Sequence, residues 1–215
     1  MRNVTAAILP SLFLTAVPVL PAAAQQQARS WHFAVLLDGK HIGEHDFILT
    51  RHGDEEVVDI AAHFKVGVAF IPLYVYDHHN HEVWRNGCVI SVSSRTNDNG
   101  HKDFVEGAEQ DQAFTVRSAR GAVTLPACVR TFAYWDENLL AQPPLLNTQT
   151  GEFQSVTLTA GSLQSVTVAG RPLAAKRYSL RGSHLAIDVW YSDAGDWVAL
   201  ESKLESGRTL RYEIQ

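Results

Sequence analysis

Alternation of apolar and polar residues dominates the chain from Trp31 onward. Trp31, Phe33, Val35 and Leu37 share one face of an expected strand, and Asp38-Gly39 follows as a tight hairpin turn. The same period of two continues through residues 42–49, 58–68, 74–76, 83–96 and 104–105, with Asn99-Gly100 as a second hairpin signal. Apolar residues at every second position indicate strands with one buried face.

The C-terminal part repeats this pattern after one short interruption. Asp136 is expected to cap a helix over residues 137–141, which Pro143-Pro144 ends. Strands are expected at 153–159, 163–168, 173–180, 185–191, 197–204 and 208–214. Because a sheet of about a dozen strands must curl, split or close, we predict an all-β fold. Its core is a single strongly curved antiparallel sheet, half-barrel or barrel-like, with one short helix.

The N-terminus has the features of a secretory signal peptide over residues 1–24. Arg2 precedes an uncharged apolar stretch, and Ala22-Ala23-Ala24 offers small residues for cleavage. No later stretch is apolar enough for a membrane span. We therefore expect a periplasmic or secreted protein, with residues 25–215 forming a single β domain.

Composition and cysteine content are consistent with a folded exported chain. Apolar residues make up 46% of the sequence and charged residues 19%, which excludes disorder. The net charge of −5, without clustered cations, argues against nucleic acid and anionic membrane surfaces as partners. Cys88 and Cys128 are expected to form a disulfide in an oxidising compartment, the alternative being a reactive thiol beside a histidine.

Three stretches together resemble a family of exported proteobacterial proteins that carry a domain of unknown function. These stretches are residues 76–100, residues 131–151 with Tyr134-Trp135, and residues 188–214 with Trp190-Tyr191. The resemblance covers the whole expected mature chain and implies no particular activity. More remotely, the C-terminal pattern is similar to curved-sheet periplasmic proteins of the lipoprotein-carrier type, a similarity of fold only.

The densest group of chemically active side chains is Asp77-His78-His79-Asn80-His81-Glu82. On a strand, His79 and His81 share one face, whereas His78, Asn80 and Glu82 share the other. His79 and His81 are therefore a candidate metal site, completed by one of His41, His45 and His63. The alternative is a solvated polar strand, and we expect no obligatory cofactor.

A second candidate is catalytic and uses His78, Glu82 and Asp98. Glu82 and Asp98 are possible partners in a carboxylate pair of the glycosidase type, although Asp98 also suits an ordinary turn. Arg85 and Arg95 are available to bind an anion or to pair with Glu82. The sequence contains no GxSxG motif, phosphate-binding glycine loop or dinucleotide fingerprint.

The third candidate is an apolar cavity on the concave face of the sheet. Trp84, Tyr134, Trp135 and Trp190 are its expected walls, and the helix with its leucine pairs is expected to act as a plug or a lid. The alternative is that these aromatic residues only fill a core.

These observations favour a non-catalytic binding protein for an apolar or amphipathic, lipid-like small molecule in the cell envelope. Two alternatives remain at this point. One is an envelope-acting hydrolase or lyase that uses His78 and Glu82, with or without a metal ion. The other is a structural protein that binds a protein partner. The sequence carries no indication of the oligomeric state.

Overall fold

The computed structural model describes residues 28–68 and 71–215, so the predicted signal peptide lies outside the described residues. The first run of strands comprises β1 (Ala28–Leu37), β2 (Lys40–His52), β3 (Glu55–Val68), β4 (Ile71–Arg85), β5 (Cys88–Asp98), β6 (His101–Gln110), β7 (Ala113–Ser118) and β8 (Gly121–Pro126). The second run comprises β12 (Thr157–Val168), β13 (Arg171–Arg181), β14 (Ala186–Ser192), β15 (Trp197–Lys203) and β16 (Thr209–Ile214). In each run, every strand pairs antiparallel with the next one along the chain.

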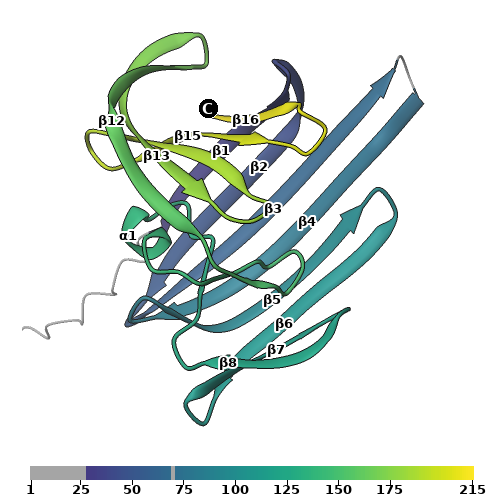
Figure 1. Ribbon diagram of the computed structural model, residues 1–215, viewed down its shortest axis with the longest axis vertical. Coiled ribbons are helices and arrows are strands. Elements are labelled where there is room, and N and C mark those ends of the chain that lie inside the picture. Colours follow the sequence, from purple (N-terminus) through teal and green to yellow (C-terminus); the bar gives the residue numbers. More distant parts are fainter. Residues whose placement is uncertain (1–27, 69–70) are drawn as a thin grey trace, which may run out of the picture.

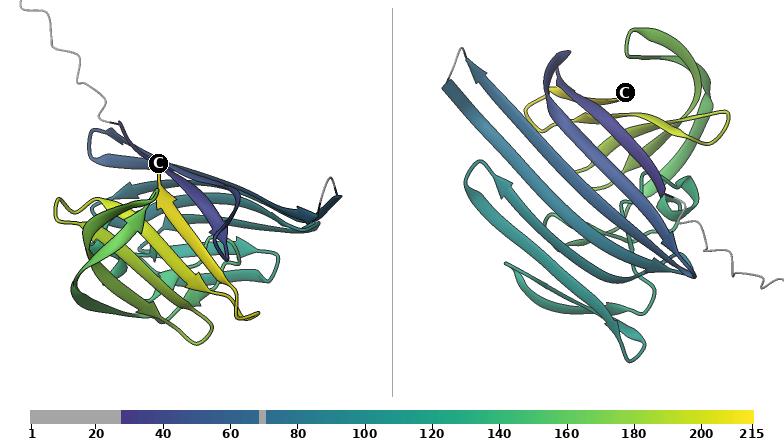
Figure 2. Two further views of the ribbon diagram at one scale, coloured as in Figure 1. Left: turned by 90° about the horizontal axis from the view of Figure 1, so that it is seen from above. Right: turned by 180° about the vertical axis from the view of Figure 1, so that it is seen from behind.

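The two runs join into one sheet of thirteen strands through the antiparallel pairing of β1 with β16, from Phe33 opposite Ile214 to Leu37 opposite Leu210. The order across the sheet is β12-β13-β14-β15-β16-β1-β2-β3-β4-β5-β6-β7-β8, with β12 and β8 as its two edges. The sheet curls strongly but does not close, as the views in Figures 1 and 2 show. The predicted all-β fold with one curved antiparallel sheet is confirmed.

The chain between β8 and β12, residues 127–156, covers the concave face of this sheet; we call it the internal segment. It contains β9 (Arg130–Thr131), α1 (Glu137–Leu140), β10 (Leu145–Leu146) and β11 (Phe153–Gln154), and β9 and β10 run parallel. Its fully buried residues join the inward-facing side chains of the large sheet in one core, and they include Val129, Ala133, Leu140, Leu145 and Leu146. The core therefore lies between the sheet and a piece of its own chain.

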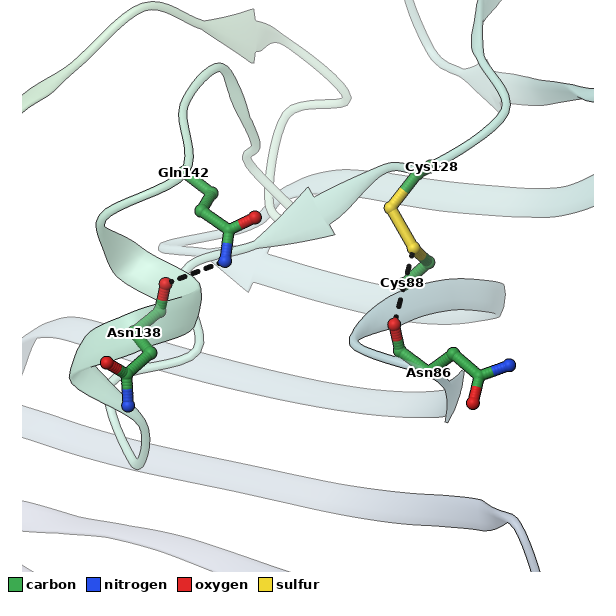
Figure 3. Close-up of a disulfide and its surroundings, with 5 residues drawn as sticks. All are labelled: Asn86, Cys88, Cys128, Asn138 and Gln142. Carbon is green, nitrogen blue, oxygen red and sulfur yellow. Dashed lines mark hydrogen bonds between the residues drawn. A yellow bond between two sulfur atoms is a disulfide. The ribbon is translucent and has the colours of Figure 1, made fainter.

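Helix α1 begins as the sequence predicts. The Asp136 carboxylate accepts a hydrogen bond from the backbone N–H of Asn138 at 2.8 Å, which is the N-cap interaction. At the other end, the Gln142 side chain donates to the carbonyl of Asn138 at 3.1 Å (Figure 3). No helix in the described part of the chain is long and apolar enough to cross a membrane.

Some strand boundaries differ from the sequence-based expectation. The stretch 83–96 is divided between β4 and β5 by a turn at Asn86-Gly87, whose φ angles of 52° and 72° match the twist of a tight hairpin. Strands β7 and β8 have no counterpart in the prediction, because the Asp111-Gln112 turn that leads from β6 into β7 contains no glycine. The expected strands 153–159 and 163–168 are largely one strand, β12, interrupted by a bulge between Ala160 and Leu163.

The far half of the β12–β13 hairpin folds over the outer face of the sheet and forms a second, smaller core. Trp190 lies in this cluster with Val166, Val168, Ala175, Val198 and Ala199. The hairpin is fixed to β16, since the Arg211 guanidinium donates to the carbonyl of Thr167 at 2.6 Å. Glu213 accepts a hydrogen bond from the backbone N–H of Ala169 at 3.0 Å.

A disulfide between Cys88 and Cys128 fixes the start of the internal segment to β5, as predicted (Figure 3). The two Cα atoms lie 5.0 Å apart, and 40 residues separate the cysteines in the sequence. Next to the disulfide, Val89 N–H donates to the carbonyl of Val129 at 2.8 Å. The disulfide and this bridge set where the segment enters the concave side.

We predict that the double variant Cys88→Ser/Cys128→Ser is less stable than the native protein by about 4 kcal/mol, the chain-entropy value for a loop of this length. Urea denaturation of both proteins measures the difference. Addition of a thiol reductant is the control, because it should destabilise the native protein and leave the double variant unchanged. Equal midpoints for the two oxidised proteins would contradict the prediction.

Candidate functional site

Two buried histidines lie two strands apart on the concave face of the sheet. His45 on β2 lies opposite Ala62 on β3, and Ala62 lies opposite His78 on β4. Neighbouring strands are about 4.8 Å apart, so the two histidine Cα atoms are separated by about 10 Å. All three residues are buried, and the small alanine leaves space between the two imidazoles.

Gly43 fixes the path of β2 two residues before His45. A Cβ atom at this position would collide with the carbonyl oxygen of His63 on β3. Glycine therefore allows β2 and β3 to approach closely at the point where His45 enters the concave face.

A cavity of about 230 Å³ lies between the sheet and the internal segment. The large sheet contributes His45, Phe47, Ile60, His78, Glu82 and Ile187, the β13–β14 turn contributes Leu185, and the internal segment contributes Phe132, Tyr134, Asn147, Thr148 and Gln149. A second hollow of about 570 Å³ shares Asn147 and Leu185 with it and is also lined by Phe153 and Val156. Together the two volumes lie within the range of about 300–1,000 Å³ that is typical of ligand pockets.

His45 is the most unusual residue of this cavity. Its ring packs 4.4 Å from Phe47 and 5.4 Å from Tyr212, measured between centroids. Neither ring nitrogen has a hydrogen-bond partner, although the side chain is 91% buried. Burial lowers the pKa of His45 to about 3, with a smaller effect from His78 in the same direction. His45 is therefore a neutral imidazole with an unused donor and an unused acceptor.

His78 is also neutral in the folded protein. Its Nδ1 atom forms a hydrogen bond with the hydroxyl of Thr96 at 2.9 Å. Burial lowers its pKa to about 4, and the neighbouring His79 acts in the same direction. The bond to Thr96 holds the imidazole against β5.

Glu82 is fully buried at the wall of the cavity, where both its oxygens accept hydrogen bonds. Oε1 accepts from the Asn80 amide at 2.7 Å, and Oε2 accepts from the Trp84 indole at 2.7 Å and from the Thr131 hydroxyl at 2.9 Å. Burial raises the pKa of Glu82, and these three donors oppose that effect. Because Thr131 belongs to β9, this carboxylate holds the internal segment on the sheet.

Two further contacts hold the wall formed by the internal segment. The Asn80 amide donates to the Thr148 hydroxyl at 3.2 Å, and the Ser94 hydroxyl donates to the Thr148 carbonyl. On the opposite side, the Tyr191 hydroxyl donates to the carbonyl of Tyr134 at 2.7 Å. The cavity is thus bounded by polar contacts on both sides of an apolar interior.

The structure does not bring Glu82 and Asp98 together. Asp98 pairs with Tyr76, six residues from Glu82 along β4, which corresponds to about 20 Å. Carboxyl groups of glycosidase pairs are about 5–9.5 Å apart, so these two residues cannot form such a pair. Arg85 and Arg95 are exposed and form ion pairs with Glu55 and Glu106 rather than with Glu82.

The predicted metal ligands lie on the outer face of the sheet. His79 and His81 are exposed there, and His81 Nδ1 is 2.7 Å from a carboxylate oxygen of Asp59. Of the proposed third ligands, His63 pairs with Asp77 at 2.5 Å on the outer face, whereas His45 is inside. Within residues 28–68 and 71–215, no three His, Cys, Asp or Glu side chains are grouped to hold a metal ion.

The four predicted aromatic wall residues fall into three places. Tyr134 lines the cavity. Trp84 and Trp135 pack edge to face at 5.9 Å in the adjoining core. Trp190 must be removed from the set, because side chains alternate along β14 and its indole lies in the second core on the outer face.

The sequence prediction gave His45 only the role of a possible metal ligand. The inward orientation of His45 could have been predicted from the sequence, because His45, Phe47 and Leu49 occupy alternate positions of the predicted strand 42–49 and share its apolar face. The sequence could not predict that Asn147, Thr148 and Leu185 line the cavity, since this depends on where the internal segment and the start of β14 meet.

We predict that His45→Phe raises stability at neutral pH and reduces sensitivity to acid. The variant removes two unpartnered buried nitrogens from an aromatic environment. In the native protein the pKa of His45 is about 3, below its unfolded value, so the unfolded chain binds more protons between these two values. The free energy of unfolding therefore falls as the pH drops below about 6.5, by about 2 kcal/mol for this group at about pH 5.

Urea denaturation at neutral pH and at about pH 5 measures this effect. The loss of stability on acidification should be smaller in His45→Phe than in the native protein. His79→Phe, one strand residue on the outer face, should behave as the native protein does. Identical acid sensitivity of His45→Phe and the native protein would show that His45 is not buried as described.

We predict that Glu82→Gln destabilises the fold by about 1–3 kcal/mol. The NH₂ group of the glutamine side chain would face a donor from which the carboxylate oxygen now accepts a hydrogen bond. Thermal and urea unfolding measure the loss, and hydrogen exchange should become faster in the internal segment. Glu44→Gln, at an exposed position of β2, is the matched control. An unchanged midpoint for Glu82→Gln would argue against the role of this carboxylate in holding the segment.

Comparison with known proteins agrees with this architecture. The structure is similar to the crystal structure of a beta-barrel-like protein of the domain of unknown function DUF1849 from Brucella abortus, with a TM-score of 0.64. The two chains are 10% identical, and the similarity covers 86% of this chain and 94% of the other. At this identity the likeness concerns the fold alone. A search of the curated proteins finds no match.

Residues 33–215 match the family described as Domain of unknown function (DUF6134). The match begins in β1 and extends past β16, so it includes the large sheet, the internal segment and both cavity walls. The chain therefore belongs to the DUF6134 family.

Proposed function

We propose that the protein binds an apolar or amphipathic small molecule in the cavity between the sheet and the internal segment, without altering it chemically. The observation that carries this proposal is a largely apolar cavity with an unpartnered, buried histidine at its wall. Buried polar groups in folded proteins nearly always have partners. A bound molecule would supply the partner that His45 lacks.

The two adjoining hollows support an elongated molecule. The inner one, about 230 Å³, contains the two buried histidines, and the outer one, about 570 Å³, is lined by Phe153, Val156 and Leu185 together with polar residues such as Gln154 and His184. A small polar group would fit beside the histidines of the inner space, and the rest of an amphipathic molecule would extend past Leu185 into the outer space.

Binding has more support than catalysis at this site. Both oxygens of Glu82 are engaged by hydrogen-bond donors, and Nδ1 of His78 is bound to Thr96. Neither residue therefore offers the free, paired acid and base that hydrolysis needs.

We place this function in the periplasm or outside the cell. The Cys88–Cys128 disulfide fits an oxidising compartment. The signal-peptide pattern of residues 1–24 supports the same location.

Native mass spectrometry of protein exported by its host and purified without detergent is the direct test. We expect a retained adduct of lipid-like mass in addition to the protein less two hydrogens for the disulfide. The apolar dye N-phenyl-1-naphthylamine, added to delipidated protein, should also bind and fluoresce. Absence of both an adduct and dye binding would contradict the proposal.

We predict that Leu185→Trp weakens dye binding at least about tenfold, since a larger side chain where the two hollows meet would block the passage between them. The melting temperature should change little because Leu185 is only half-buried. Leu173→Trp makes the same substitution at an exposed leucine of β13 and should bind the dye normally. Equal affinities of the two variants would place the dye elsewhere.

A further inference from the structure

We propose that the ligand carries an uncharged hydroxyl group, which enters the inner cavity first and hydrogen-bonds to His45 beside His78. This inference rests on the proposed binding function and names the chemical class of the molecule: a neutral lipid alcohol rather than a fatty acid or a cationic amphiphile.

The first argument concerns charge. The ionisable side chains that line the inner cavity are His45, His78, Glu82 and Tyr134. Burial keeps both imidazoles neutral and raises the pKa of the Tyr134 phenol, so that it is also neutral. Glu82 already holds three donors. A charged head group would thus lose its water without gaining a free counter-ion, which is strongly unfavourable.

The second argument concerns hydrogen-bonding capacity. A neutral imidazole has one N–H donor and one nitrogen acceptor, and neither is used at His45. A hydroxyl group both donates and accepts. A single hydroxyl reaches one of the two ring nitrogens, and it can bind either, by accepting from the N–H or by donating to the bare nitrogen. A carboxylate suits only the N–H and an ammonium only the bare nitrogen, and each also brings a charge into the cavity. Next to the cavity, the Asn80 amide nitrogen donates to Glu82 and Thr148, and the Oδ1 atom of the same side chain is a further buried acceptor without a partner.

The third argument concerns direction. The unpartnered imidazole lies on the floor of the cavity, on the strand row formed by β2, β3 and β4. The outer hollow is reached past Leu185 and Asn147, which line both spaces. The hydroxyl end of the ligand therefore lies against β2, β3 and β4, and its chain extends past Leu185 between the β13–β14 turn and the internal segment.

Competition against bound N-phenyl-1-naphthylamine tests the inference with three probes of equal chain length: 1-dodecanol, dodecanoate and dodecylammonium, at neutral pH. We expect 1-dodecanol to displace the dye at a concentration at least about tenfold lower than either charged probe. If dodecanoate or dodecylammonium displaced the dye at the same concentration as 1-dodecanol, the inference would be overturned and the binding function would stay in place. Absence of dye binding together with absence of a native mass-spectrometric adduct would instead remove the proposed function.

Two variants test whether the preference for 1-dodecanol over the charged probes depends on His45. Relative to the affinity of each protein for the dye, His45→Phe should lose about three- to tenfold in affinity for 1-dodecanol, the effect of one neutral hydrogen bond. His79→Phe, on the outer face, should keep the native preference. An unchanged preference in His45→Phe would overturn the assignment. Because His45→Phe removes buried unsatisfied atoms, we expect this variant to fold.

Discussion

The curled sheet leaves a large apolar concave face that it cannot cover by closing on itself. The two edge strands, β8 and β12, do not pair, so the barrel stays open and the chain between them must bury that face. Residues 127–156 do so with leucines and aromatic residues, carried by one short helix and a small three-stranded sheet of order β11-β10-β9. Everything else in the interior depends on this segment remaining on the sheet.

Two chemically different contacts keep the segment in place. The disulfide joins its start to β5, and the buried carboxylate of Glu82 accepts a hydrogen bond from Thr131 a few residues later. Leaving a buried carboxylate without its donors is costly, so Asn80, Trp84 and Thr131 form one unit. This explains why a residue that resembles a catalytic acid in the sequence serves to position the cavity wall.

The sequence was sufficient for the elements that depend on local periodicity and turns. The strand around Trp31, the cap at Asp136 and the inward set His78, Asn80 and Glu82 all follow from alternation or capping rules. It was not sufficient for contacts that depend on how the sheet curls. Trp190 resembles a cavity residue in the sequence but lies on the outer face, where the β12–β13 hairpin folds back and buries it. Asp98 and Glu82 belong to neighbouring stretches of the sequence, but the pairing of β5 with β4 places them far apart along the strands.

The similarity to the DUF1849 protein at 10% identity shows how little of this architecture depends on particular side chains. Alternating apolar residues and tight turns suffice for a curved antiparallel sheet, whereas a buried histidine without a partner lowers stability. A feature that the fold does not need, and that weakens it, calls for an explanation outside folding. In this chain that feature is His45, and the cavity beside it is where such an explanation lies.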